Sequence, residues 1–128
     1  MLKDNPLMAT IPASDLDRAK EFYSNVLGLT PSEEPDQGAA WYEVGGSRFL
    51  LYQSAFAGTN QATAASWMVD GLESIVDTLK GQGVEFQEFE IEGLTMENSI
   101  VTAPDGNRAA WFFDSERNII NLTETPAS

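Results

Sequence analysis

The order of segments along this chain repeats, and the repeat limits the possible folds more than any other feature. Residues 39–53 (AAWYEVGGSRFLLYQ) match residues 109–123 (AAWFFDSERNIINLT) at a constant shift of 70 positions. Upstream of each, residues 14–29 match residues 70–84 at a shift of 56, with one gap. Two matches in the same order indicate that one supersecondary unit occurs twice.

Each copy predicts a strand, a helix and then three strands. The first helix is expected from Asp15 to Leu27, with Ser14 as its N-cap and Gly28 at its end. The second helix is expected to begin at Asp70. Apolar residues recur at helical spacing and give each helix one apolar face: Leu16, Ala19, Phe22, Tyr23, Val26 and Leu27 in the first, and Leu72, Ile75, Val76 and Leu79 in the second.

The strands and the modules complete the predicted fold, which is α+β. Two βαβββ modules, 1–53 and 64–123, are joined by the linker 54–63 and form one domain over residues 1–128. We expect a curved mixed sheet with both helices on its outer face, so that the concave face becomes the natural cavity. Besides the first strand of each module, strands are expected at 29–34, 39–45, 48–53, 84–91, 98–103, 108–113 and 118–123.

Composition excludes several classes of function. The chain has 20 acidic and 7 basic residues, a net charge of −13, so nucleic acid and anionic membranes are not expected partners. It has no histidine and no cysteine, which excludes Ser-His-Asp and Cys-His catalysis and thiolate or imidazole metal sites. The start, MLKDNPLMAT, has no apolar core typical of a signal peptide, so the expected location is cytoplasmic. The negative charge provides solubility, or it attracts a cationic ligand.

Three segments give the chain a family resemblance: ASDLDRAKEFYSNVLGL, ASWMVDGLESIVDTLKGQGVEFQEFE and AAWFFDSERNIINLTE. Together they resemble the vicinal oxygen chelate superfamily, which includes glyoxalases, bleomycin-resistance proteins and extradiol dioxygenases. The resemblance covers nearly the whole chain and implies the paired-module fold and a homodimer. One departure lies at 114–118 (DSERN), which keeps the Asp and Asn of the family turn and lacks its Pro and Gly.

The resemblance also implies where a metal would bind. Its ligand positions, carried over to this chain, are Met8, Leu51, Ala64 and Asn121, and the repeat pairs Met8 with Ala64 and Leu51 with Asn121. Three of these side chains cannot bind a hard or borderline cation, and Asn121 offers one neutral amide oxygen. We therefore expect the fold and a ligand cavity, with no metal and no cofactor.

Aromatic and acidic side chains are further candidates. Trp41 and Trp111 occupy equivalent positions in the two copies, where they form either aromatic walls for a planar ligand or part of the core. Trp67 is expected in the core. Glu43, flanked by apolar residues, is a weak candidate for a catalytic base if it faces the cavity, and otherwise a surface carboxylate.

Polar side chains on the concave face complete the predicted ligand site. Thr10, Gln53, Ser66, Asn121 and Thr123 share this side in the predicted alternation, in an otherwise apolar pocket. The predicted ligand-binding residues are Met8, Thr10, Trp41, Leu51, Gln53, Ser66, Trp111 and Asn121.

Three functions remain open at this point. The leading hypothesis is a metal-free protein of this superfamily that binds a small cationic or aromatic molecule on its concave face. The alternative is a lyase, isomerase or dioxygenase-type enzyme of the same superfamily. The third is a module for protein–protein interaction, because a fold alone does not determine function.

Overall fold

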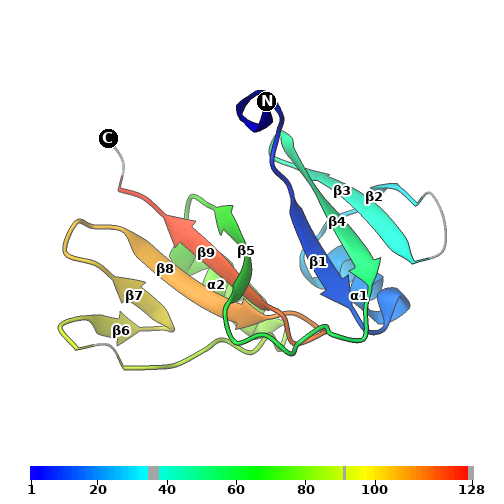
Figure 1. The fold of residues 1–128 in the computed structure, drawn as a ribbon. Helices are drawn as coiled ribbons and strands as arrows, with labels where there is room; N and C mark the ends of the chain where they lie inside the picture. Colours follow the sequence, from blue (N-terminus) through cyan, green and yellow to red (C-terminus); the bar gives the residue numbers. More distant parts are fainter. Residues whose placement is uncertain (35–37, 91, 127–128) are drawn as a thin grey trace.

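A computed structural model describes residues 1–34, 38–90 and 92–126 of the chain. Figure 1 shows two sheets, one for each module, with strand orders β1-β4-β3-β2 and β5-β9-β8-β7-β6. The strands are β1 (Ala9–Ala13), β2 (Pro31–Glu33), β3 (Ala39–Val44), β4 (Ser47–Gln53), β5 (Thr63–Met68), β6 (Thr95–Glu97), β7 (Ile100–Thr102), β8 (Arg108–Phe113) and β9 (Ile119–Glu124). The helical segments are η1 (Leu2–Asp4), α1 (Leu16–Glu21), η2 (Phe22–Val26) and α2 (Leu72–Gly81).

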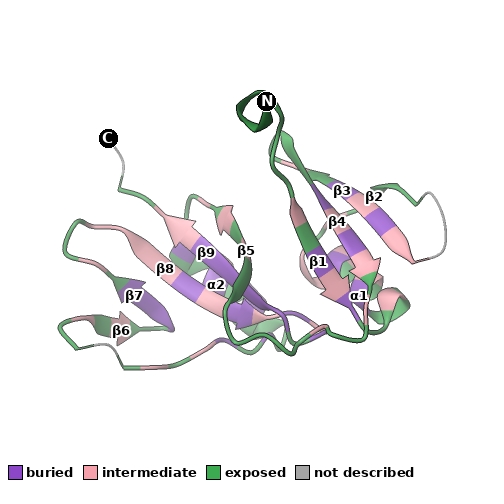
Figure 2. Cartoon of the chain, in the orientation of Figure 1, coloured by how far each residue is buried: buried purple, intermediate pink, exposed green. Residues whose placement is uncertain are grey.

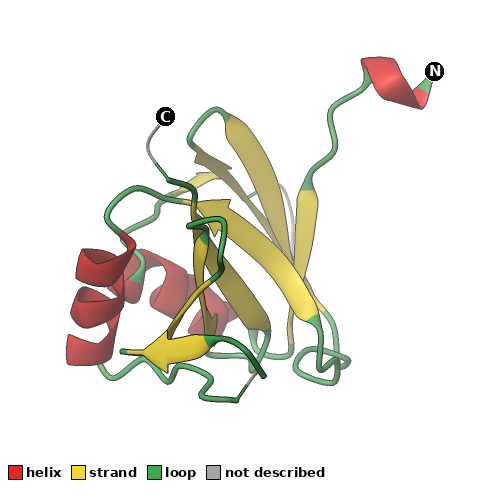
Figure 3. Ribbon diagram, turned by 90° about the vertical axis from the view of Figure 1, so that its left-hand side faces the viewer, coloured by secondary structure: helices red, strands yellow, loops and turns green. Residues whose placement is uncertain are grey.

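The modules repeat the same pairing. The first strand of each runs parallel to the last, β1 to β4 and β5 to β9, and the other pairs are antiparallel. Both helices cover one side of the strands, as predicted (Figure 3). The expected continuous sheet is divided, because β1 and β5 are neighbours that belong to separate sheets.

The helices differ from the prediction mainly at their ends. Asp15, not Ser14, caps α1, since its carboxylate accepts a hydrogen bond from the Arg18 N–H at 3.1 Å. After Glu21 the helix widens into a π-helical turn, η2. At α2 the cap is supplied from β9, where the Glu124 carboxylate accepts hydrogen bonds from the two N–H groups that open the helix. Among the described residues no helix is long and apolar enough to cross a membrane.

The segment 84–91 was wrongly predicted as a strand. It forms one isolated bridge, Phe86 to Phe112, and position 91 lies outside the described residues. Phe86 and Val84 are buried beneath α2. Their apolar pattern therefore reflects packing against the helix and not membership of a hydrogen-bonded strand ladder. The short strand β6, Thr95–Glu97, was missed because its sequence carries little apolar alternation.

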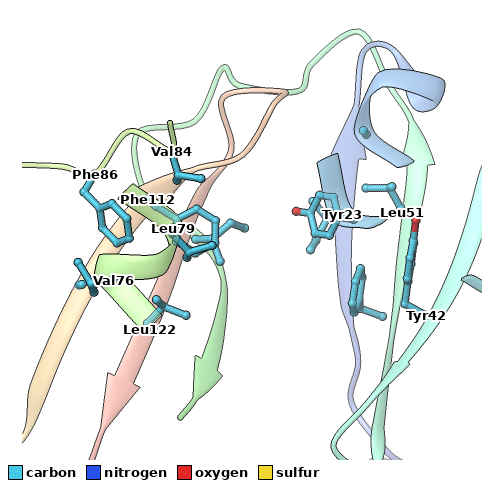
Figure 4. Close-up of a cluster of buried hydrophobic side chains, with 14 of the residues drawn as sticks. Tyr23, Tyr42, Leu51, Val76, Leu79, Val84, Phe86, Phe112 and Leu122 are labelled. Carbon is cyan, nitrogen blue, oxygen red and sulfur yellow. The ribbon is translucent and has the colours of Figure 1, made fainter. Parts of the chain in front are cut away.

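The core fills the space between the sheets and the helices (Figure 4). On the side of the first module, Tyr23 from η2 packs near Tyr42 and Phe49, whose rings stack with centroids 4.9 Å apart. Phe49 also meets Trp67 of β5 edge to face at 5.9 Å. One hydrophobic core therefore spans both modules.

A buried polar cluster fastens the β8–β9 turn of the second module to the first. Tyr23 donates its hydroxyl hydrogen to Asp114 at 2.8 Å, and the Asn118 amide donates to the Pro12 carbonyl at 2.7 Å. Glu116, whose side chain is fully buried, accepts from the Arg18 guanidinium at 2.8 and 3.0 Å. The Asp and Asn that the turn shares with the family thus join the modules.

Ionisation of the two carboxylates follows from their surroundings. Burial alone would raise the pKa of Glu116, but hydrogen bonds from Arg18, the Asp15 N–H and nearby serines outweigh it and lower that pKa to about 2. Burial raises the pKa of Asp114, and hydrogen bonds from Asn118 and Tyr23 oppose the rise only in part. Of these two carboxylates, Glu116 is therefore the one whose charged form the fold stabilises.

Candidate ligand-binding site

The alternation of each strand defines two faces. In β1 and β4, the side chains of Ile11, Phe49 and Leu51 point toward the helices and are buried. Their neighbours Thr10 and Leu50 pair on the opposite face, which we call the concave face. In Figure 2 the buried residues alternate with more accessible ones along β3, β4 and β8.

A cavity of about 360 Å³ lies where β1 and β5 meet, beside the β3–β4 hairpin. Both modules contribute to it, and most of the side chains are apolar. The lining consists of Leu7, Met8, Ala9, Ile11, Val44, Gly45, Ser47, Arg48, Phe49, Ala65, Ser66, Trp67 and Met68. A space of this size at a module boundary is typical of a small-molecule site.

The rim of this cavity leaves apolar side chains in water. Leu7 is 98% exposed, Met68 is 67% exposed and Met8 is 42% exposed. Exposed apolar groups that adjoin a cavity mark an interaction site more often than isolated ones do. The rim therefore points to an apolar binding partner.

The charge of the cavity differs from that of the whole chain. Arg48 is the charged residue of its lining, and its guanidinium lies over the Trp41 ring at 4.3 Å from the centroid. Its ion pair with Glu33 is long, 3.8 Å between nitrogen and oxygen. Although the chain carries −13, no carboxylate lines this cavity in the described part of the chain.

Met8 and Ser66 of the predicted site line the cavity, and the other predicted residues lie elsewhere. Thr10 and both predicted tryptophans share the concave face by register, outside the cavity lining. Trp111 donates its indole hydrogen to Thr63 at 3.2 Å and packs on Phe89 at 5.3 Å. Trp41 and Trp111 are thus each covered by a neighbour of their own, and they do not line one shared pocket.

Two predicted ligand residues were placed on the wrong face. Leu51 is fully buried among the core residues, next to Tyr23 and Tyr42 in Figure 4. Gln53 shares that side of β4, and its amide donates to the Ser14 carbonyl. A shift of one position moves a strand residue to the opposite face, and the constant shift of 70 made that error beyond the hairpin.

The comparisons with known proteins agree with this architecture. The family model for the Glyoxalase/Bleomycin resistance protein/Dioxygenase superfamily matches residues 6–122. The chain belongs to this superfamily. A comparison of the sequence with curated proteins finds no match.

Solved structures of the superfamily share the fold at low sequence identity. A lactoylglutathione lyase from Agrobacterium tumefaciens superposes with a TM-score of 0.72 and 15% identity, over 94% of this chain and 92% of that one. A glyoxalase/bleomycin resistance protein/dioxygenase from Alicyclobacillus acidocaldarius gives 0.71 and 15%, over 97% and 93%. A glyoxalase/bleomycin resistance protein from Catenulispora acidiphila gives 0.68 and 20%, over 94% and 97%.

The positions that the resemblance assigns to metal ligands in this superfamily do not fit a metal here. Met8 offers a thioether and Ala64 a methyl group. Leu51 lies in the core, and Leu50, which the strand register makes the equivalent of Asn121, is apolar as well. The amide oxygen of Asn121 already accepts a hydrogen bond from Thr123 at 2.6 Å, and the amide nitrogen donates to the Ala110 carbonyl at 3.3 Å. Across 1–34, 38–90 and 92–126, no three His, Cys, Asp or Glu side chains gather in a way that could hold an ion.

Glu43 has an exposed side chain near the end of β3, opposite Arg48 of β4. It does not line the cavity between the modules. A general base must reach the group from which it takes a proton, and Glu43 lines a separate, open hollow at the tip of the β3–β4 hairpin. Its predicted catalytic role gains no support from this position.

Several residues that line the cavity were not predicted from the sequence. They include Arg48, Phe49, Trp67 and Met68. Trp67 was assigned to the core, where it packs in part, and it also reaches the cavity. One signal was present: Met68 follows Trp67 on the solvent side of its strand, where a polar residue is usual.

Proposed function

We propose that this chain binds a small apolar or aromatic molecule without a metal ion, in the cavity between β1 and β5. The observation that carries the proposal is the mostly apolar lining supplied by both modules, with an exposed apolar rim. The side chains at the superfamily's metal positions support the metal-free part, since they offer no adequate set of donors.

The lining bears on the class of ligand. Phe49 and Trp67 meet at 5.9 Å beside the cavity and offer aromatic surface to a ring. The net charge of the chain suggested a cation, but the cavity's own charged residue is Arg48. Short-range contacts outweigh distant charges that salt screens over about 8 Å, so the lining favours a neutral aromatic molecule over a cation.

The enzyme alternative draws on the lactoylglutathione lyase among the similar structures, which at 15% identity supports the fold alone. A lyase, isomerase or dioxygenase here would need acid–base or metal-binding groups beside the substrate. The cavity lining contributes two serines and one arginine as its polar side chains. These groups suit binding better than catalysis.

Metal analysis separates binding from metal-dependent catalysis. Protein purified without a histidine tag is expected to contain far less than one equivalent of zinc, nickel, iron or manganese. Chelator is expected to leave its melting temperature unchanged, because no bound ion stabilises the folded state. Elemental analysis and a melting curve with and without EDTA give the answer. Near one equivalent of any of these metals would favour the enzyme.

A further inference from the structure

A second cavity, of about 350 Å³, lies on the helix side of the sheets between the two modules. The first module contributes the end of η2 and the residues that follow it, and the second contributes β5, α2, β8 and β9. Its floor is buried and consists of Leu79, Phe112 and Leu122, which are drawn in Figure 4. Among the described residues, Trp67 alone lines both this cavity and the one between β1 and β5. The two are therefore separate cavities that share one wall.

Exposure to water increases from the floor of this helix-side cavity to its mouth. Above the buried floor, the side chains of Leu27, Leu29 and Ile75 are half-buried. Ser74 and Thr78 lie one helical turn apart on α2 and are exposed at the mouth. Water finds few hydrogen-bond partners in an apolar space, so its displacement by an apolar ligand is favourable. The lining thus suits a molecule with an apolar body and a polar end.

The helix-side cavity is uncharged in a strongly acidic chain. Charged residues make up 21% of the sequence, but none lines this cavity in the ranges that the structure describes. Asp77 and Lys80 of α2 contact Asn98 in the β6–β7 turn, on the flank of the helix away from Ser74 and Thr78. A cation finds no carboxylate in the lining, and an anion is repelled by the net charge of −13. Charge therefore favours a neutral ligand.

The walls distinguish an alkyl chain from an aromatic ring. Most of the apolar side chains that line this cavity are branched and aliphatic, and the two aromatic ones are Trp67 and Phe112. Each of these rings already packs on another ring, Trp67 on Phe49 at 5.9 Å and Phe112 on Phe86 at 5.7 Å. A flexible alkyl chain gains dispersion contacts along an irregular aliphatic surface, where a flat ring would leave gaps. The walls therefore favour an aliphatic ligand.

We propose that the helix-side cavity is a second binding site, which holds a medium-length aliphatic alcohol. The alkyl chain lies against the buried floor, and the ligand hydroxyl exchanges hydrogen bonds with the hydroxyl groups of Ser74 and Thr78 at the mouth. An apolar cavity of about 150 Å³ is large enough for benzene, so one of about 350 Å³ accommodates an alkyl chain. Binding at this site does not rest on the proposed function, because the two cavities share only the Trp67 wall within the described residues.

Titration of the parent with n-octanol, followed by two-dimensional NMR of the backbone amides, tests the site. Saturable shifts are expected at Leu27, Ile75 and Thr78, and not at Gly45 or Ser47, which line the other cavity. Binding of n-butanol should be at least about 30-fold weaker, because fewer methylene groups leave water. Octanoate and octyltrimethylammonium should each bind at least about tenfold more weakly than n-octanol, because the lining offers no opposite charge.

Two adjacent positions of α2 provide a matched pair of variants. Thr78→Trp places an indole in the mouth of the cavity and should weaken n-octanol binding at least about tenfold. Asp77→Trp is the control, because its side chain lies on the Asn98 flank of the helix, and it should bind n-octanol like the parent. Both positions are exposed, so melting curves should show that both variants fold.

The two binding sites fail in different ways. Shifts that stay linear in n-octanol concentration, or a Thr78→Trp variant that binds like the parent, overturn the helix-side site. Octanoate or octyltrimethylammonium binding as tight as that of n-octanol overturns the neutral ligand. Ser66→Trp fills the cavity between β1 and β5 and should leave n-octanol binding unchanged. If Ser66→Trp abolishes this binding and Thr78→Trp does not, the alcohol occupies that other cavity, which overturns the second site and supports the proposed function.

Discussion

The variant Leu51→Glu is expected to be unfolded or nearly so at neutral pH, whereas Leu50→Glu should fold. Leu51 is fully buried on the helix side of β4, where a carboxylate finds no partner. Lost apolar contacts and an unpaired buried charge together remove at least about 5 kcal/mol, which is comparable to the whole stability of a small domain. Leu50 is half-buried on the concave face, so its variant should lose about 1 kcal/mol or less.

Urea unfolding followed by circular dichroism measures both variants. The pair is well matched, because the two positions are adjacent and the substitution is identical. If Leu50→Glu unfolds the chain and Leu51→Glu does not, the faces of β4 are reversed, and with them the assignment of the concave side.

The difference between Leu50 and Leu51 also explains why Leu51 was predicted on the wrong face of β4. In β3 and β4, Trp41 lies opposite Leu50, and in β8 and β9, Trp111 lies opposite Asn121. The second hairpin is thus one residue longer, and the repeat shift changes from 70 to 71 beyond the turn. The equivalent of Asn121 is Leu50, not Leu51. The Ala-Ala-Trp identity sets the repeat shift only for residues before the turn, because it carries no information on turn length. Use of the same shift beyond the turn therefore paired the wrong residues.

Other parts of the fold were predictable because their signals are local. The apolar faces of both helices follow from spacing alone, and Gly45-Gly46 marks the first hairpin through two positive φ angles. The cap of α2 was not predictable, since Glu124 reaches it from 52 and 53 residues away along the chain. The cavity was predicted on the concave face. Its observed position, where β1 and β5 meet, depends on how the two modules pack together, which no local sequence pattern encodes.

Replacement of Glu116 is expected to give the second large loss of stability. Its carboxylate accepts hydrogen bonds from Arg18, Ser14 and the Asp15 N–H, and so links the β8–β9 turn to the start of α1. Lowering its pKa from 4.5 to about 2 corresponds to about 3 kcal/mol of stability at neutral pH. Glu116→Gln should lose most of this and Glu116→Ala somewhat more, measured by urea unfolding at pH 7.

The loss should depend on pH with a defined sign. The pKa of Glu116 is lower in the folded chain, so its contribution is present above about 4.5 and disappears as the pH falls toward 2. Burial raises the pKa of Asp114, which contributes with the opposite sign, but the difference between parent and Glu116→Gln cancels it. That difference should shrink from pH 5 to pH 2.5. A difference that stays constant would show that Glu116 acts through packing and not through charge.

Arg117 takes a backbone conformation in this turn that side chains other than glycine rarely adopt. Its φ is +68°, in the left-handed region that favours glycine, at the place where the family turn carries its Gly. The guanidinium lies 4.0 Å above the Phe113 ring and pairs with Glu85 at 3.1 Å. These exposed contacts offset part of the backbone strain, so the turn keeps its shape without the glycine.

A titration with N-phenyl-1-naphthylamine in EDTA tests whether the superfamily fold retains a ligand cavity here and does without the metal. This neutral dye becomes fluorescent in apolar surroundings. We expect saturable binding to one site per chain, equal with and without EDTA. Ser66→Trp, which fills the cavity from an exposed position of β5, should weaken binding at least about tenfold, and Thr102→Trp on β7 should not. Binding that never saturates, or a Ser66→Trp variant that titrates like the parent, would show that this cavity is not a metal-free ligand site.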